Sequence, residues 1–296
     1  MKKLIKKFAL AAAATVLLTG LAACSKADSG SGSSSASSSG SSSTASSTDE
    51  NKEIILGICA GPYGDLFTDA IYPTLEEKGY TLKIVEFSDY VQPNHALANG
   101  ETNVNLFQHS NYLKKFSEDN KLDLTMLTEV PTVGMGVYSD KLKSLDELAD
   151  GAVVTVPDDA SNLARALRVL QAAGLIKLNP GVDPASATEK DVAENPKNLE
   201  FVLTEAPQLP RTLDSADIAV VNGNFATSAG LDPANALYNE VLVDGYLNVV
   251  AVRTEDKDSQ LAKDIIDAVH SDAFRSVIDA SGSGYEAFQK PQSYND

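Results

Sequence analysis

The sequence predicts an α/β fold in two lobes, each an open mixed sheet flanked by helices. Short apolar runs of strand length alternate with amphipathic stretches of helix length, a pattern typical of sheets covered by helices. Residues 51–296, 246 in all, suit two lobes better than one hydrophobic core. Two crossings between the lobes leave a cleft, and clefts at domain junctions bind small molecules. We therefore expect a ligand-binding cleft between the lobes.

The N-terminal residues 1–23 predict a signal peptide, followed by a lipidated cysteine. Four lysines precede a short apolar run, residues 8–18, and Leu21-Ala22-Ala23-Cys24 has the pattern of a lipobox. The run is too short to span a membrane. Cleavage before Cys24 and acylation of its thiol would anchor the protein to the cell membrane on its extracytoplasmic side; a soluble, cleaved signal is the alternative. That location excludes most enzymes that depend on cytoplasmic nucleotides.

Residues 24–50 are expected to form the lipidated Cys24 and a flexible tether. Residues 25–48 are almost entirely Ser, Gly, Ala and Thr, so they cannot bury enough apolar surface to offset their ordering entropy. Chains of this composition reach about 25–30 Å, which lifts a domain off a bilayer and lets it swivel.

The net charge limits the classes of partner that the protein can bind, and the cysteine content indicates the role of its free thiol. Removing residues 1–23, which carry four lysines and no acid, takes the formal net charge from −17 to −21. Such an acidic chain argues against nucleic acid as a partner. Cys59 is then the one free cysteine, and its apolar run, residues 54–60, favours a buried structural thiol over a nucleophile.

The first lobe is expected to comprise residues 51–139 and 248–296. Its predicted strands lie at 54–60, 81–86, 104–107, 122–128, 134–139 and 247–252, and its helices at 65–78, 92–98, 111–118, 259–269 and 272–280. The last two helices are predicted to pack on this lobe. Residues 141–150 are expected to cross into the second lobe, with Ser144 as an N-cap and Glu147 completing a capping box.

The second lobe is expected to comprise residues 140–247. Its predicted strands lie at 152–156, 199–203 and 218–221, and its helices at 161–173, 190–194 and 207–213. Gly174 stands where a glycine commonly ends a helix.

Catalytic and metal-binding patterns fit this chain badly. It has no Gly-x-Ser-x-Gly and no His-Glu-x-x-His, and Ser281-Gly282-Ser283-Gly284 lacks the lysine and the following helix of a phosphate-binding loop. With three histidines, a His-rich metal site is hard to build. We therefore expect no enzyme, no cofactor and no metal.

The segments 89–94 and 103–113 are the richest in side chains suited to a ligand. Phe107, Gln108, His109 and Tyr112 follow a predicted strand end, so two aromatic rings, an imidazole and an amide are expected to gather at one sheet edge. Such a wall suits an apolar or thioether side chain, because sulfur packs well against aromatic ring edges. The alternative is that the aromatic residues belong to the core and that His109 caps a helix.

A second group lies at residues 156–167 and 222–224. Arg165 stands in the first turns of a helix, where it opposes the helix dipole, so it is a candidate for holding a carboxylate; solvation at the surface is the alternative. Asp158 and Asp159 are expected to cap that helix rather than to form a catalytic pair. Asn222-Gly223-Asn224 could supply amide oxygens to an ammonium group or form a simple turn.

Together these segments resemble the NlpA-type family of methionine-binding lipoproteins, the substrate receptors of methionine ABC importers. The resemblance runs from about Lys52 to the C-terminus. Its most specific motifs are Tyr90-Val91-Gln92-Pro93-Asn94, Asn105-Leu106-Phe107-Gln108-His109, residues 156–167, Gln208-Leu209-Pro210-Arg211 and Val221-Asn222-Gly223-Asn224-Phe225. It implies a two-lobed fold of the type II periplasmic-binding-protein kind.

The resemblance also implies the roles of the site residues. Tyr90, Phe107, His109 and Tyr112 would line a thioether pocket, and Arg165 would hold the α-carboxylate. Amide side chains would fix the backbone groups of the amino acid, namely Asn162, Asn224 and Asn248. The chain departs from the family pattern at Asp158, Ala160 and Ala164, in the loop 61–65 and after Gly284; an extra acid near Arg165 is expected to weaken carboxylate binding.

The expected function is capture of methionine, L and possibly D, and its delivery to the permease of an ABC importer whose ATPase is a separate chain. The protein is expected to be a monomer, bound to the membrane by its lipid. The alternatives are a receptor for another amino acid or a short peptide, and a surface-contact lipoprotein without a transport role.

Overall fold

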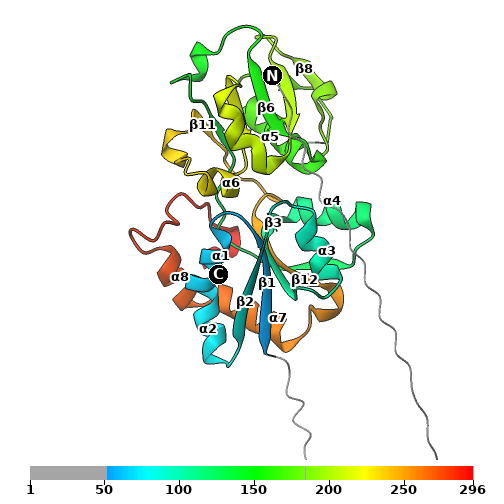
Figure 1. Cartoon of the computed structure of the whole chain (residues 1–296), viewed down its shortest axis with the longest axis vertical. Helices are drawn as coiled ribbons and strands as arrows, with labels where there is room; N and C mark the ends of the chain where they lie inside the picture. The colour runs from blue at the N-terminus through cyan, green and yellow to red at the C-terminus, as the bar shows by residue number, and fades with distance from the viewer. Residues whose placement is uncertain (1–51, 184, 296) are drawn as a thin grey trace, which may run out of the picture. The chain divides into compact units, whose positions relative to one another are not determined.

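The computed structural model describes residues 52–183 and 185–295, and it contains two five-stranded sheets. The strand order is β2-β1-β3-β12-β4 in the first sheet and β11-β5-β10-β6-β9 in the second. Both sheets mix parallel and antiparallel pairs and are flanked by helices (Figure 1). The predicted fold class is therefore confirmed. The predicted signal peptide, Cys24 and the tether lie outside the described residues.

The first sheet is parallel at one side and antiparallel at the other. β1 pairs in parallel with β2 and β3, and β12 runs antiparallel to both β3 and β4. The strands are β1 (Glu53–Cys59), β2 (Thr81–Phe87), β3 (Val104–His109), β4 (Leu124–Glu129) and β12 (Asn248–Arg253). Because β12 returns from the second sheet, the chain crosses between the sheets twice.

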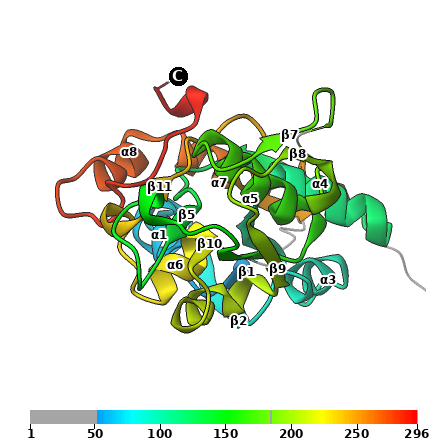
Figure 2. The same ribbon diagram turned by 90° about the horizontal axis from the view of Figure 1, so that it is seen from above.

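Side chains that alternate along the strands fill two separate cores of the first sheet. Val250 and Val252 face one core, together with Phe67 and Phe274, whereas Val249 faces the other. The first core is covered by α1 (Tyr63–Leu66), a π-helical turn (Phe67–Ile71), α2 (Tyr72–Glu77), α7 (Gln260–Val269) and α8 (Asp272–Ile278). The second is covered by α3 (Gln92–Ala98) and α4 (Ser110–Asn120). Figure 2 shows α8 on the opposite flank from α3 and α4.

The two C-terminal helices pack on the first core, as the sequence predicts. Ile265 and Val269 of α7 and Phe274 and Ile278 of α8 are buried in that core. Ser259 and Ser271 start these helices, because each hydroxyl accepts a hydrogen bond from a backbone N–H of the first turn.

The second sheet has its own core. β10 pairs in parallel with β6 and antiparallel with β5. The strands of the second sheet are β5 (Gly136–Tyr138), β6 (Val153–Pro157), β9 (Glu200–Thr204), β10 (Ile218–Val221) and β11 (Tyr238–Asn239). α5 (Ala160–Ala172) buries Leu163, Leu167 and Leu170 against it and ends before Gly174, whose φ of 78° suits glycine. α6 (Gly223–Ser228) follows β10 directly.

Short 3₁₀ turns and a two-stranded sheet complete the described chain. The small sheet pairs β7 (Lys177–Leu178) with β8 (Val192–Glu194). The 3₁₀ turns are Leu145–Glu147, Glu189–Asp191, Ala206–Asp214, Pro233–Asn235, Thr254–Asp256 and Gln292–Asn295. In the described part of the chain, no helix combines the length and the apolar character needed to cross a membrane.

The structure corrects the predicted crossing point and some local details. β5 pairs with β10, so the chain leaves the first sheet after β4, before Gly136, and not at 141–150. Residues 192–194, predicted as helix, form β8. Ser144 does cap the turn after it, but the carboxylate of Glu147 accepts a hydrogen bond from the backbone N–H of Lys143, so no capping box forms with Ser144.

Candidate ligand-binding site

The aromatic candidates meet where strands of the first sheet end. Phe107 and His109 lie at the end of β3, whose six residues are all buried, and Tyr112 lies in the first turn of α4. Tyr90 follows β2 in the next loop, and its backbone carbonyl accepts a hydrogen bond from the Tyr112 hydroxyl at 3.1 Å. All four side chains are buried.

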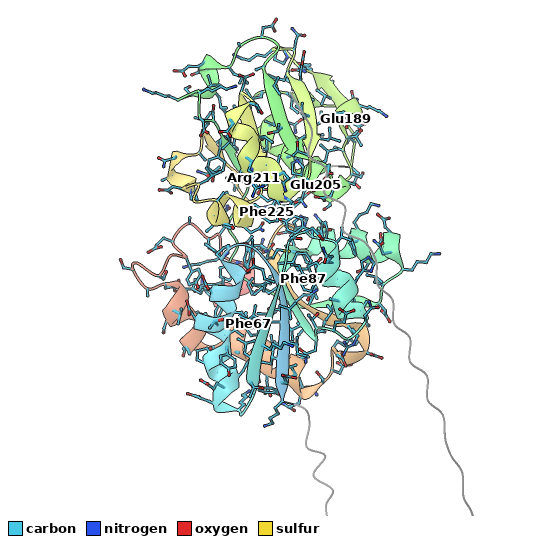
Figure 3. The ribbon with its side chains drawn as sticks, in the orientation of Figure 1. Phe67, Phe87, Glu189, Glu205, Arg211 and Phe225 are labelled. Carbon is cyan, nitrogen blue, oxygen red and sulfur yellow. The ribbon has the colours of Figure 1, made fainter. Side chains whose placement is uncertain are left out.

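These rings form a continuous wall. The ring centre of Tyr90 lies 5.9 Å from that of Phe107 and 5.7 Å from that of Tyr112. Phe225 of α6 comes from the second-sheet side and lies 5.0 Å from Tyr90, so the wall spans both halves; Figure 3 shows Phe225 at the level where they meet. Burial raises the pKa of Tyr90 and of Tyr112, so their hydroxyls stay protonated and donate hydrogen bonds.

His109 has two roles in this arrangement. It is the N-cap of α4, because Nδ1 accepts a hydrogen bond from the backbone N–H of Tyr112 at 3.0 Å. Nδ1 is therefore unprotonated, and Nε2 carries the proton toward Oδ1 of Asn162, 3.3 Å away. Burial, aided by the charge of Arg165, lowers the pKa of His109 to about 3. The imidazole is thus a neutral donor that joins the two halves.

Amide side chains face this wall from the second half. The carboxylate of Asp159, the N-cap of α5, accepts hydrogen bonds from both N–H groups of Asn162, main chain and side chain. These bonds fix Asn162, whose Oδ1 accepts a hydrogen bond from Nδ2 of Asn222 at 2.8 Å. Asp159 therefore caps the helix, as the sequence predicts.

Asn224 links the halves directly. Its Oδ1 accepts a hydrogen bond from the Tyr90 hydroxyl at 2.6 Å, and its Nδ2 donates to the carbonyl of Ala60 at 2.9 Å. Asn248, the first residue of β12, stands opposite His109 in the antiparallel pairing. Its side chain forms no hydrogen bond with any other described residue, so its amide is free for a ligand.

Together these side chains line a narrow cavity that is partly open to solvent; the space not filled by atoms, with its solvent-facing part included, is about 320 Å³. All eight residues that the sequence analysis selected line it, namely Tyr90, Phe107, His109, Tyr112, Asn162, Arg165, Asn224 and Asn248. Five others also line it: Tyr63, Gln108, Val133, Asn222 and Gly223. In the described residues, His, Cys, Asp and Glu side chains form no group of three or more that could hold a metal ion.

Arg165 is buried in the cavity wall, and its charge is partly matched. It is 4% exposed, and its Nε and Nη2 donate hydrogen bonds to the carboxylate of Glu240, with a shortest distance of 2.6 Å. Burial alone would lower the pKa of Arg165, but the Glu240 carboxylate outweighs this effect, so the pKa is raised and the guanidinium stays charged. Nη1 has no hydrogen-bond partner among the described residues.

A second unmatched polar atom lies in the same cavity wall. Oδ1 of Asn222 is buried and has no hydrogen-bond partner among the described residues. A buried acceptor of this kind costs free energy unless something donates to it. Arg165 and Asn222 both line the cavity, and each carries one polar atom without a partner among the described residues, Nη1 and Oδ1 respectively.

The comparison with known proteins gives the family. The sequence profile of the family described as NlpA lipoprotein matches residues 54–291. The chain belongs to the NlpA lipoprotein family. It is similar to the D-methionine-binding lipoprotein MetQ of Salmonella typhi, with 40% identity over 224 residues that cover 75% of this chain and 82% of the relative. The corresponding protein of Yersinia pestis is 39% identical over 237 residues, which cover 79% and 86%.

Solved structures of similar proteins agree with this fold. A nutrient-binding protein from Burkholderia cenocepacia, solved bound to methionine, has a TM-score of 0.75 and 38% sequence identity, covering 80% of this chain and 99% of that one. The crystal structure of the methionine-binding protein MetQ has a TM-score of 0.73 and 37% identity, covering 81% and 96%.

Sequence reasoning on this NlpA lipoprotein missed two residues that line the cavity, Tyr63 and Val133, and also Glu240, the partner of Arg165. The first two come from a short helix and a crossing segment that carry no polar motif. Glu240 carried no local signal, because it follows the polar Asn239 and its partner Arg165 lies 75 residues away in the sequence. Asp158, the acid expected near Arg165, is instead exposed and does not line the cavity.

The neutral state of His109 gives a pH prediction for folding. Burial lowers the pKa of His109 from 6.5 to about 3. Below pH 6.5 the imidazole is therefore protonated in the unfolded chain, whereas in the folded protein it stays neutral down to about pH 3. The contribution of the neutral His109 to the free energy of unfolding is complete above pH 6.5 and is lost as the pH falls toward 3. Between pH 7 and pH 5 this one group should lower the free energy of unfolding by about 2 kcal/mol.

Urea unfolding at pH 7 and pH 5 measures this effect, with His109→Gln as the reference that cannot titrate. The unaltered protein should lose about 2 kcal/mol more than His109→Gln over that interval. Equal losses in the two proteins would show that His109 is protonated in the folded state.

Proposed function

We propose that this chain is a substrate-binding lipoprotein that captures methionine in the cavity between its two sheets and delivers it to an ABC importer. The observation that carries the proposal is one cavity with Arg165 at one place in its wall and the rings of Tyr90, Phe107 and Tyr112 at another. An amino acid with an apolar, sulfur-containing side chain has the matching chemistry.

The polar part of the cavity suits the backbone of a zwitterionic amino acid. Burying two opposite charges requires a partner for each. Nη1 of Arg165 is available for the carboxylate, and Oδ1 of Asn222 is available for the ammonium. Asn162, Asn224 and Asn248 complete the set of amides that would fix these groups.

The aromatic part suits the thioether. Sulfur contacts aromatic rings favourably, often at the ring edge, and Phe107 and Tyr112 lie at 74° to each other, so one presents its edge where the other presents its face. The neutral imidazole of His109 adds no charge that would disfavour an apolar side chain.

The remaining parts of the proposal concern location and partners. The lipobox at Cys24 supports a lipid anchor on the extracytoplasmic face of the cell membrane, and membership of a lipoprotein family supports it further. The partners would be a permease and a separate ATPase subunit, with this chain as a monomer. The relatives named above are binding proteins, which supports a role in binding and not in catalysis.

Titration calorimetry with L-methionine, D-methionine and a panel of other amino acids and short peptides tests the proposal. We expect L-methionine to bind most tightly or equally with D-methionine. Tighter binding of another amino acid or a peptide would assign a different ligand to the same cavity. Binding of none of them, with no small molecule seen in a native mass spectrum, would favour the surface-contact alternative.

A matched pair of variants locates the binding. Phe107→Ala removes a ring from the cavity wall and should weaken methionine binding on the order of 10- to 100-fold, because the side chain loses one apolar contact surface. Phe201→Ala removes a partly buried ring that packs against the core of the second sheet and should leave the affinity unchanged. Equal effects of the two would place the ligand elsewhere.

A further inference from the structure

Glu240 lies behind Arg165, outside the ligand cavity. It follows β11, is 8% exposed, and is not among the residues that line the cavity, whereas Arg165 is. Its carboxylate meets the inner edge of the guanidinium through Nε and Nη2, with distances of 2.6–3.0 Å. The edge that carries Nη1 is left for the cavity.

The carboxylate is itself held in place. Oε2 accepts a hydrogen bond from the backbone N–H of Met135 at 2.8 Å. The main chain of Glu240 donates to the carbonyl of Met135 at 2.9 Å and accepts from Nε2 of Gln289 at 2.8 Å. Glu240 is thus fixed by the segment that crosses between the sheets and by the C-terminal segment.

A fixed carboxylate restricts a planar guanidinium strongly. Two hydrogen bonds to one edge set both the position of the arginine and the plane of its fork. Arg165 also lies over the ring of Tyr246, 5.3 Å from its centre, which supports the same plane. Without the carboxylate, the side chain would have freedom to rotate away from a ligand.

Resting on the function proposed above, we propose that Glu240 is a positioning residue that aims Arg165 at the ligand carboxylate and makes the site selective for zwitterions over simple anions. Arg165 and Glu240 together carry no net charge. A zwitterion adds none, so the ligand and the Arg165–Glu240 pair together stay neutral. A ligand with a carboxylate but no ammonium leaves one negative charge unmatched in a buried place.

Two ligands that differ only in the ammonium test this selectivity. L-Methionine is a zwitterion, and 4-(methylthio)butanoate is the same molecule without the amino group. In Glu240→Gln the ammonium of methionine loses a nearby anion, while the anionic ligand loses a repulsive one. The dissociation constant of 4-(methylthio)butanoate divided by that of L-methionine should therefore fall about five- to tenfold relative to the unaltered protein. A structural defect would weaken both ligands alike and leave the ratio unchanged, which would overturn the proposal.

Glu240→Asp separates position from charge and also serves if Glu240→Gln fails to fold. Its shorter side chain keeps the charge but cannot reach both Nε and Nη2 from the same main chain. Methionine should bind several-fold more weakly while the ratio between the two ligands stays that of the unaltered protein. Unchanged methionine affinity would show that Glu240 does not position Arg165.

Asp264→Asn is the matched control. Asp264 is also a buried carboxylate, bonded to Nζ of Lys78 at 2.6 Å and to the Tyr80 hydroxyl at 2.8 Å, but it lies on α7 away from the cavity. Both ligands should bind Asp264→Asn as they bind the unaltered protein; a changed ratio here would show that the ratio does not report on Glu240. Failure of the unaltered protein to bind methionine would refute the proposed function instead, a result that no variant of Glu240 can produce.

Discussion

Arg165→Ala should both unfold the protein more easily and abolish high-affinity methionine binding. Removing the guanidinium leaves the Glu240 carboxylate buried without its cation, so the free energy of unfolding should fall by about 3–5 kcal/mol. The ligand carboxylate also loses its cationic partner, and the loss of a partner from a buried charge pair should cost about 2–5 kcal/mol of binding free energy. Urea unfolding and calorimetry measure the two effects separately.

The double variant Arg165→Leu with Glu240→Leu separates stability from binding. Replacing both members of a buried ion pair by apolar side chains is often neutral for stability or even stabilising. The double variant should therefore be about as stable as the unaltered protein and still fail to bind methionine. Retained binding would remove Arg165 from the ligand site, and a loss of stability as large as in Arg165→Ala would mean that packing, and not the unpaired charge, causes the defect.

An exposed ion pair provides the control for this prediction. Lys177 and Glu194 pair at 2.7 Å on the small two-stranded sheet, and both side chains are exposed. Lys177→Ala should change the free energy of unfolding by less than about 1 kcal/mol and leave the binding of methionine unaffected.

The strands and helices could be predicted because the local sequence pattern of each one indicates it. The run from Ile218 to Val221 is buried on both faces of its sheet, and a run of four β-branched or small apolar residues indicates such a strand wherever it pairs. The same reasoning explains the error at the crossing. Gly136–Tyr138 has the same strand signal whether it joins the first sheet or the second, and only its pairing with β10 decides.

The cavity residues were predictable to the extent that they lie at strand ends or in recognisable motifs. Phe107 and His109 lie at the end of a buried strand, and Asn224 lies in the first turn of a helix that directly follows another. Glu240 was not predictable, because its partner Arg165 lies 75 residues away and no local pattern relates the two. The position of Arg165 against its helix dipole is visible in the sequence, whereas the buried carboxylate of Glu240 that compensates its charge is visible only in the structure.

Gly61→Ala should weaken methionine binding without altering any group that lines the cavity. Gly61 lies in the loop after β1 with a φ of 134°, a conformation that residues with a Cβ rarely adopt. A Cβ there would lie 2.6 Å from Cβ of Asn224 and 2.8 Å from its carbonyl oxygen. The neighbour is the main chain of α6 and cannot simply rotate away.

The consequence follows from the role of Asn224. An alanine at 61 would push α6 away from the first sheet and stretch the hydrogen bonds of Asn224 to the Tyr90 hydroxyl and the Ala60 carbonyl. The two walls of the cavity would then no longer meet around a ligand. We expect the dissociation constant for methionine to rise at least about tenfold, since strain and misfit of this kind cost on the order of 1–3 kcal/mol.

Gly174→Ala controls for the effect of replacing a glycine with positive φ. Gly174 has a φ of 78°, but a Cβ there would meet nothing within 4 Å. It should lower the free energy of unfolding by about 1 kcal/mol through backbone strain alone and leave methionine affinity unchanged. If Gly61→Ala bound methionine as well as Gly174→Ala does, the contact between Gly61 and Asn224 would not limit how closely the two halves approach around the ligand.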